Sequence, residues 1–270
     1  MSKAQDEISD VTHPKREAVY RVEGKIAGML SVMPKCWSLL IADLTAGHGC
    51  LAPNSTAMSA VKHALFLRSV GKHCRLVLSD NNPQYATHLH GLCDDSEVWT
   101  MDYSDAVGRL AERQYDGGLA LIDPYRHIEN LEKIGANAAR MPNVDMLFSV
   151  GATNLKRMAV ALNMRTRTSD IRDAMDKRYW YVMEPIGGFR QWTLMLGSNT
   201  NKIQSIASIG FYPMDSERGI DIAAKLDKTR KEMAQECIRT TPNTSRIHSL
   251  ESQLLLPMPG LPEDANVAVG

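Results

Sequence analysis

Four acidic residues have the spacing of a ligand site: Asp43, Asp80, Asp102 and Asp123. Each follows a short, mostly apolar stretch that is typical of a β-strand. Ligands of open α/β sheets bind at the carboxyl ends of the parallel strands, so we expect the four side chains to converge on one cleft. A single acid at a strand end often starts a turn or caps a helix, but four in succession favour a ligand site.

The first of these acids lies in the stretch from Trp37 to Gly49, W-S-L-L-I-A-D-L-T-A-G-H-G. Residues 37–42 are mostly apolar and predict a strand buried on both faces. A glycine loop with Gly47 and Gly49 follows Asp43, and then comes a helical pattern. Strand, acid, glycine loop and helix are typical of a nucleotide-binding corner. Tight turns also need glycine, so a turn-only interpretation of the loop stays open.

Apolar spacing predicts the elements that position these acids. We expect a helix over 15–30 before the first strand and a helix from Ala57 that ends near Gly71 after it. Further strands are expected over 74–79, 97–101, 119–122 and 144–150, with helices between them. After the last of these strands we expect a helix over 152–167, a second helical piece over 170–177, a β-hairpin of 179–186 with 191–196, and a charged helix over 216–238. Alternating strands and helices imply parallel βαβ units. The predicted fold class is α/β, with a doubly wound, mostly parallel, seven-stranded sheet closed by an antiparallel hairpin.

Composition sets outer limits on the function. The 270 residues include 31 basic and 31 acidic side chains, so no overall charge indicates a nucleic-acid or membrane partner, although a local basic patch stays open. The five cysteines form no C-x-x-C pair, which favours reduced thiols and disfavours a zinc site. The amino terminus has no apolar signal core, and no stretch has the length of a membrane span. We expect a soluble, cytoplasmic protein that binds no metal.

The spacing of the motifs disfavours two common nucleotide sites. The interval from Asp43 to Asp80 exceeds the roughly 20 residues of a nicotinamide fingerprint, and the loop is not G-x-G-x-x-G. No G-K-[S/T] follows the glycines, as a phosphate-binding loop requires. A ribose diol needs a carboxylate that accepts two hydrogen bonds, and Asp80 ends the second strand. The alternative is that Asp80 only starts the turn at 81–83.

The chain resembles class I S-adenosylmethionine-dependent methyltransferases over about residues 35–200. The resemblance rests on the D-L-T-A-G-H-G loop, Asp80, Asp102, the I-D-P-Y segment and the closing hairpin. The resemblance implies S-adenosylmethionine as cofactor. It places the loop residues Asp43, Thr45, Ala46, Gly47 and Gly49 beside the methionine part, Asp80 on the ribose, and Asp102 with Tyr103 near the adenine. The implied organisation is an amino-terminal segment and helix (1–34), a Rossmann-like methyltransferase domain (35–200), a helical extension (201–239) and a flexible tail (240–270).

A narrower resemblance is to the three-Cys-motif partner proteins. The A-G-x-G loop, an apolar helix, the strand R-L-V-L-S-D and the I-D-P strand end come in the order of that family, followed by V-D-M-L-F-S-V, N-L-K-R and W-T-L-M-L-G-S-N.

The reactive centre implied by the resemblance is Asp123-Pro124-Tyr125. Methyltransferases that act on adenine or cytosine hold the target amino group with a strand-end [D/N/S]-P-P-[Y/F], which directs the nitrogen lone pair at the methyl group. This chain has one proline fewer, which puts the stacking role of Tyr125 in doubt. The alternative is that Asp123-Pro124 only ends a strand.

Several other residues could take part. Arg126, Lys156 and Arg157, with Arg165 and Arg167, could contact phosphates, although a solvated helix face explains such charges equally well. His48 could contact the cofactor or act as a base, but a plain loop position is favoured. Trp180 and Trp192 are favoured as core residues over base-stacking platforms.

The function expected from these residues is methyl transfer from S-adenosylmethionine to an amino nitrogen of a nucleobase in DNA or RNA. One alternative is an inactive, methyltransferase-like binding or regulatory protein, and a second is another nucleotide-using enzyme on the same fold. A nucleic acid substrate is the expected partner, with a protein partner at the tail after Thr240.

Overall fold

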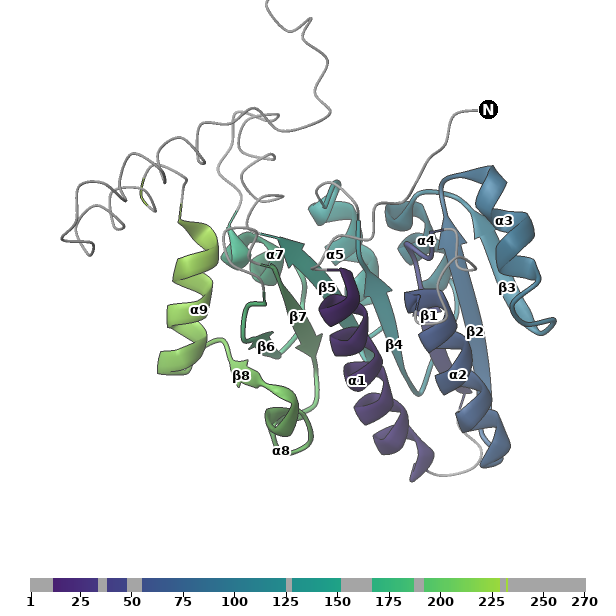
Figure 1. The fold of residues 1–270 in the computed structure, drawn as a ribbon, viewed down its shortest axis with the longest axis horizontal. Coiled ribbons are helices and arrows are strands. Elements are labelled where there is room, and N and C mark those ends of the chain that lie inside the picture. Colours follow the sequence, from purple (N-terminus) through teal and green to yellow (C-terminus); the bar gives the residue numbers. More distant parts are fainter. Residues whose placement is uncertain are drawn as a thin grey trace, which may run out of the picture. The chain divides into compact units, whose positions relative to one another are not determined.

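The structure is a computed structural model that describes residues 12–33, 38–47, 55–124, 128–151, 167–186, 192–228 and Glu232. The chain divides into two units, residues 1–227 and 228–270, and nearly all of the described residues belong to the first. In this first unit, helices flank both faces of a single sheet (Figure 1).

The sheet has eight strands in the order β3-β2-β1-β4-β5-β7-β6-β8. Its strands are β1 Ser38–Asp43, β2 His73–Asp80, β3 Ser96–Thr100, β4 Gly117–Ile122, β5 Val144–Gly151, β6 Tyr179–Met183, β7 Trp192–Ser198 and β8 Phe211–Pro213. The strands β1 to β5 pair in parallel, whereas β7 pairs antiparallel with β5 and β6, and β8 pairs antiparallel with β6. The α/β class, the mostly parallel sheet and the antiparallel hairpin are therefore confirmed.

The predicted count of seven strands is wrong, because β8 adds an eighth at the edge. Phe211, Tyr212 and Pro213 pair with Met183, Val182 and Tyr181. Three residues are too few to show an alternating apolar pattern. The sheet therefore continues beyond residue 200.

The helices form two layers. They are α1 Thr12–Ser31, α2 Thr56–Ser69, α3 Pro83–His90, α4 Tyr103–Leu110, α5 Leu131–Ala139, α7 Thr168–Ala174, α8 Ile203–Ile206, a 3₁₀ turn at Ala207–Ile209 and α9 Glu217–Asp227. Buried side chains of α1, α2 and α8 share one core, and those of α4, α5, α7 and α9 share the other. Figure 1 shows α1 and α2 side by side on the same face of the sheet.

The strand β1 belongs to both cores, as its apolar run predicts. Leu39 and Ile41 pack under α1 and α2, whereas Leu40 and Ala42 face the opposite layer. All four side chains are at most 1% exposed. Burial of apolar side chains on both faces stabilises β1 within the sheet, and this fixes the position of its carboxyl end.

The ends of α1 and α2 follow the local sequence signals. The helix α1 begins at Thr12, so Pro14 lies in its first turn, where a missing backbone N–H costs no hydrogen bond. The helix therefore starts three residues before the predicted range of 15–30. The Ser55 hydroxyl caps α2 by accepting a 3.2 Å hydrogen bond from the Met58 amide, and Gly71 follows its carboxyl end with a φ of 80°.

Three predicted features lie outside the described residues: the helix over 152–167 apart from Arg167, the connection between the two hairpin strands at 187–191, and the tail after 240. Cys74 and Cys93 are free thiols. Within the described ranges, none of the helices combines the length and the apolar character needed to cross a bilayer.

Candidate functional site

Asp43 is the most deeply buried acid at the carboxyl edge of the sheet. Its side chain ends β1 with 0% exposure, and its Oδ1 accepts hydrogen bonds from the Thr45 amide (3.0 Å) and hydroxyl (3.4 Å). Its Oδ2 has no hydrogen-bonding partner among the described residues. The pKa of Asp43 is raised to about 7, chiefly by burial and to a smaller extent by the negative charges of Glu23 and Asp123, whereas Thr56 and Thr45 act to lower it.

The loop after β1 is held against both neighbouring strands. The Leu44 amide donates to the Leu121 carbonyl of β4 (3.0 Å), and the Ala46 amide donates to the Ser79 carbonyl of β2 (2.9 Å). Gly47 adopts a φ of 58°, and among the described residues no atom lies within 4 Å of the position that a Cβ would take. The described part of the chain therefore leaves space beside Gly47. Gly49 and His48 lie outside the described residues.

Asp80 ends β2 and contacts this loop directly. Its Oδ2 accepts a 2.9 Å hydrogen bond from the Gly47 amide, and its Oδ1 accepts a 2.8 Å bond from the Asn82 amide. The turn-starting role is thus real, and the bond to Gly47 adds a second role. Each carboxylate oxygen can accept about two hydrogen bonds, so Asp80 keeps capacity for a ligand diol.

Asp102 and Tyr103 both have structural tasks. The Oδ1 of Asp102 accepts a 2.8 Å bond from the Ser104 amide and caps α4. The Tyr103 hydroxyl accepts a 2.5 Å bond from the Glu129 amide, and burial raises the pKa of Tyr103 to about 12. The cap does not use the second oxygen of Asp102, so a ligand role for this residue stays a prediction.

Asp123 follows β4 and forms an ion pair with Lys15 in the first turn of α1. The Lys15 Nζ lies 2.5 Å from the Asp123 Oδ1, and the Asp123 amide donates a 2.7 Å bond to the Thr45 hydroxyl. Pro124 is buried beside it. Thr45 thus connects Asp43 to Asp123, so the ends of β1 and β4 form one polar network. Tyr125 and Arg126 lie outside the described residues.

A buried polar cluster between α1 and α2 was not predicted. Glu23 is 1% exposed and accepts a hydrogen bond from the Ser59 hydroxyl, and its Oε2 lies 3.3 Å from the His63 Nδ1. The helices approach closely here, because a Cβ added at Gly24 would lie 3.2 Å from the His63 Nε2. Burial raises the pKa of Glu23. The sequence did contain a signal for this cluster, because Glu23 is a charged residue within the apolar stripe of α1. No feature of the sequence indicated that Lys15 pairs with Asp123.

The tryptophans and basic residues singled out in the sequence differ in where the structure places them. Trp180 and Trp192 are 7% and 5% exposed, so their assignment to the core is confirmed. Arg167 is exposed at the start of α7. Lys156, Arg157 and Arg165 lie outside the described residues.

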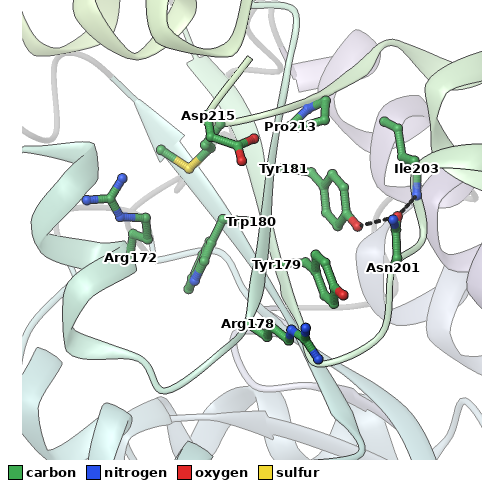
Figure 2. Close-up of a pocket in the computed structure, with 10 residues that line it drawn as sticks. Arg172, Arg178, Tyr179, Trp180, Tyr181, Asn201, Ile203, Pro213 and Asp215 are labelled. Atoms are coloured by element: carbon green, nitrogen blue, oxygen red, sulfur yellow. Dashed lines mark hydrogen bonds between the residues drawn. The ribbon is translucent and has the colours of Figure 1, made fainter.

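A pocket of about 300 Å³ lies away from these acids, at β6 (Figure 2). Its lining includes Arg178, Tyr179 and Tyr181, together with Asn201 before α8 and Asp215 after β8. The Asn201 side chain accepts a 3.1 Å bond from the Tyr181 hydroxyl. The strands β4, β5 and β7 separate β6 from β1, a span of roughly 19 Å at the usual spacing. The pocket is therefore distinct from the strand-end site.

Comparisons with known proteins find only low similarity. No family model and no curated protein matches the chain. Among solved structures, a Legionella pneumophila protein, LPL1258, has a TM-score of 0.48 at 13% identity, covering 72% of this chain and 89% of its own. The N-methyltransferase NodS of Bradyrhizobium japonicum has a TM-score of 0.45 at 10% identity, covering 72% of this chain and 99% of its own.

A second NodS structure, in complex with S-adenosylhomocysteine, has a TM-score of 0.44 at 10% identity and covers 74% of this chain and 94% of its own. The METTL16 methyltransferase domain has a TM-score of 0.43 at 14% identity, with 70% of each chain covered. All of these structures fall below a TM-score of 0.5, so a function for this chain has to rest on its own site.

Proposed function

We propose that the chain binds S-adenosylmethionine at the carboxyl edge of β1, β2 and β4 and transfers its methyl group to an amino nitrogen of a nucleobase. The observation that carries the proposal is the contact of Asp80 with the loop after β1. The 2.9 Å bond from the Gly47 amide to Asp80 holds a ribose-type acceptor against the start of the glycine loop. The resemblance of the loop and the strand-end acids to class I methyltransferases points to the same cofactor.

The residues of the edge fit the chemistry of this cofactor. The Asp43 Oδ2 is a buried oxygen without a partner among the described residues, and a cationic or N–H-bearing ligand would supply one. None of the described residues fills the space beside Gly47, and Asp80 retains acceptor capacity. When bound, the cofactor would supply an activated methyl group on a sulfonium. Asp43, Asp80 and the loop amides would hold it in place.

Asp123 would position the methyl acceptor. One of its carboxylate oxygens pairs with Lys15, and the other can accept a hydrogen bond from an exocyclic amino group. Such a bond orients the nitrogen lone pair, so the contribution is one of positioning. The nitrogen forms a bond to the methyl carbon, the carbon–sulfur bond breaks, and a proton leaves the nitrogen for solvent.

A binding or regulatory role without transfer is the second candidate, and the Lys15–Asp123 ion pair favours it. An amino-methyltransferase needs Asp123 available to its acceptor, whereas here a lysine engages that carboxylate. Such a protein would bind the cofactor and release no methylated product.

Calorimetric titration with S-adenosylmethionine, combined with labelled-methyl transfer to DNA and RNA, tests both candidates. We expect micromolar binding that Asp80→Ala weakens at least about tenfold, or 1.4 kcal/mol. The matched control is Asp94→Ala, an exposed acid in the turn before β3. Binding with transfer supports the enzyme, and binding without transfer supports the regulatory protein. Absence of binding up to millimolar cofactor would exclude both.

A further inference from the structure

Lys15 is the one basic side chain that forms a salt bridge with any of the four strand-end acids within the described part of the chain. Its Nζ reaches the Asp123 Oδ1 at 2.5 Å, although the two residues are 108 positions apart. The Asp123 side chain is 13% exposed and that of Lys15 is 27% exposed. The contact therefore connects the first turn of α1 to the end of β4, and the lysine keeps a path to solvent.

Asp123 is coupled to Asp43 through hydrogen bonds and through its negative charge. Its amide bonds to the Thr45 hydroxyl at 2.7 Å, and the Thr45 amide bonds to the Asp43 Oδ1 at 3.0 Å. The negative charge of Asp123 also contributes to the raised pKa of Asp43. A positive charge placed beside Asp123 therefore acts on the whole network of β1 and β4.

Among the described residues, the four strand-end acids have a single basic partner, Lys15, which pairs with Asp123. Asp43, Asp80 and Asp102 form no salt bridge with any described residue, and buried or half-buried charges of like sign destabilise one another. Lys15 compensates part of this negative charge while no ligand is bound. A ligand that brings its own positive charge would compensate the same acids.

We propose that Lys15 is an internal counter-ion that competes with the positive charge of S-adenosylmethionine for Asp123. The proposal rests on the proposed function. S-adenosylmethionine carries a sulfonium charge that S-adenosylhomocysteine lacks, so repulsion by Lys15 acts mainly on the methyl donor. Lys15 thus limits how strongly the site prefers the donor over the demethylated product.

The experiment is calorimetric titration of the full chain with each of these two ligands. Lys15→Met removes the charge and keeps much of the apolar stem, and Lys25→Met is the matched control. Lys25 is exposed on the same helix, about 15 Å further along its axis. Lys15→Arg keeps the charge at the site.

We expect Lys15→Met to tighten S-adenosylmethionine binding about fivefold, the range of a partly exposed ion pair, and to change S-adenosylhomocysteine binding less than about twofold. The difference should shrink between about 50 mM and about 500 mM salt, because salt screens partly exposed charges. Lys15→Arg and Lys25→Met should bind both ligands as the wild type does.

Two results would overturn the counter-ion role while leaving the proposed function intact: equal changes for both ligands in Lys15→Met, or tighter donor binding in Lys15→Arg as well. A wild type that binds neither ligand would overturn the proposed function itself, and the counter-ion role with it. Circular dichroism of each variant identifies any that fails to fold, and Lys15→Arg then decides whether charge matters.

Discussion

The backbone amide of Gly47 donates a 2.9 Å hydrogen bond to the Oδ2 of Asp80, and this bond joins the loop after β1 to the end of β2. Gly47 reaches Asp80 because its φ is 58°, a left-handed conformation that side chains disfavour. The position of the Asp80 carboxylate and the shape of the loop therefore depend on each other.

Gly47→Ala should lower the free energy of unfolding by about 1 kcal/mol, because alanine is strained at this φ. Steric overlap with the described residues should contribute nothing, since none of their atoms lies within 4 Å of the added Cβ. Gly28→Ala is the control: it is equally open but lies inside α1, where alanine should stabilise by about 0.5–1 kcal/mol. Urea denaturation measures both variants, and the same sign for both would contradict the backbone explanation.

Asp43 should make stability fall as the pH rises. Its pKa is about 7 in the folded chain, against 3.8 as the ordinary value, so between these pH values the folded state holds a proton that the unfolded state has lost. One pKa unit corresponds to about 1.36 kcal/mol, so ionisation of Asp43 should lower the free energy of unfolding by about 4 kcal/mol at most.

Asp43→Asn stays neutral at every pH, and its stability relative to the wild type should therefore increase from about pH 4 to about pH 7 and then level off. Urea denaturation over this pH series measures the effect, with exposed Asp94→Asn as control. A difference that does not change with pH would show that Asp43 ionises normally.

Ser59→Ala should cost about 1–3 kcal/mol of stability, the usual cost of leaving a buried polar group without its hydrogen-bonding partner. The Ser59 hydroxyl donates to Glu23, whose Oε1 already lacks a partner among the described residues. Ser69→Ala on the same helix removes an exposed hydroxyl that bonds to the Phe66 carbonyl at 2.8 Å and should change stability by less than about 0.5 kcal/mol. Equal losses in thermal or urea denaturation would rule out the buried bond as the cause.

Phe211→Ala should destabilise the fold by about 3–5 kcal/mol, because Phe211 is 1% exposed and belongs to the core of the α1 layer. Its neighbour Tyr212 is 37% exposed, and Tyr212→Ala should cost about 1 kcal/mol or less. The contrast, measured by chemical denaturation, tests whether β8 is an integral strand. Two small and similar losses would mean that the sheet ends at β6.

Most of the fold could be predicted from local patterns. The strands β1, β4 and β5 are nearly continuous apolar runs because both of their faces are buried, and such runs are visible in sequence. The cap at Ser55 and the turn at Gly71 have standard local chemistry. The strand β8 was missed because three residues carry no periodicity, and only the edge of β6 makes them a strand.

The site could be predicted only in part, because one residue type serves several purposes. The sequence places Asp80 and Asp102 at strand ends correctly, but an aspartate there can bind a ligand, start a turn or cap a helix. Asp80 starts a turn and also anchors the glycine loop, whereas Asp102 caps α4. The Lys15–Asp123 ion pair escaped prediction because it depends on how α1 packs against the sheet.

The strand order has a consequence for synthesis on the ribosome. The strand β7 lies between β5 and β6, although β6 precedes it in the chain. While the chain emerges, β1 to β5 can already pair, but β6 has no place in the sheet until β7 has followed it. The outer edge of β5 therefore stays unpaired over more than forty residues of elongation, from Gly151 to Ser198. An uncovered strand edge is a template for pairing with other chains, so this interval is when the nascent protein is most open to aggregation and to chaperones.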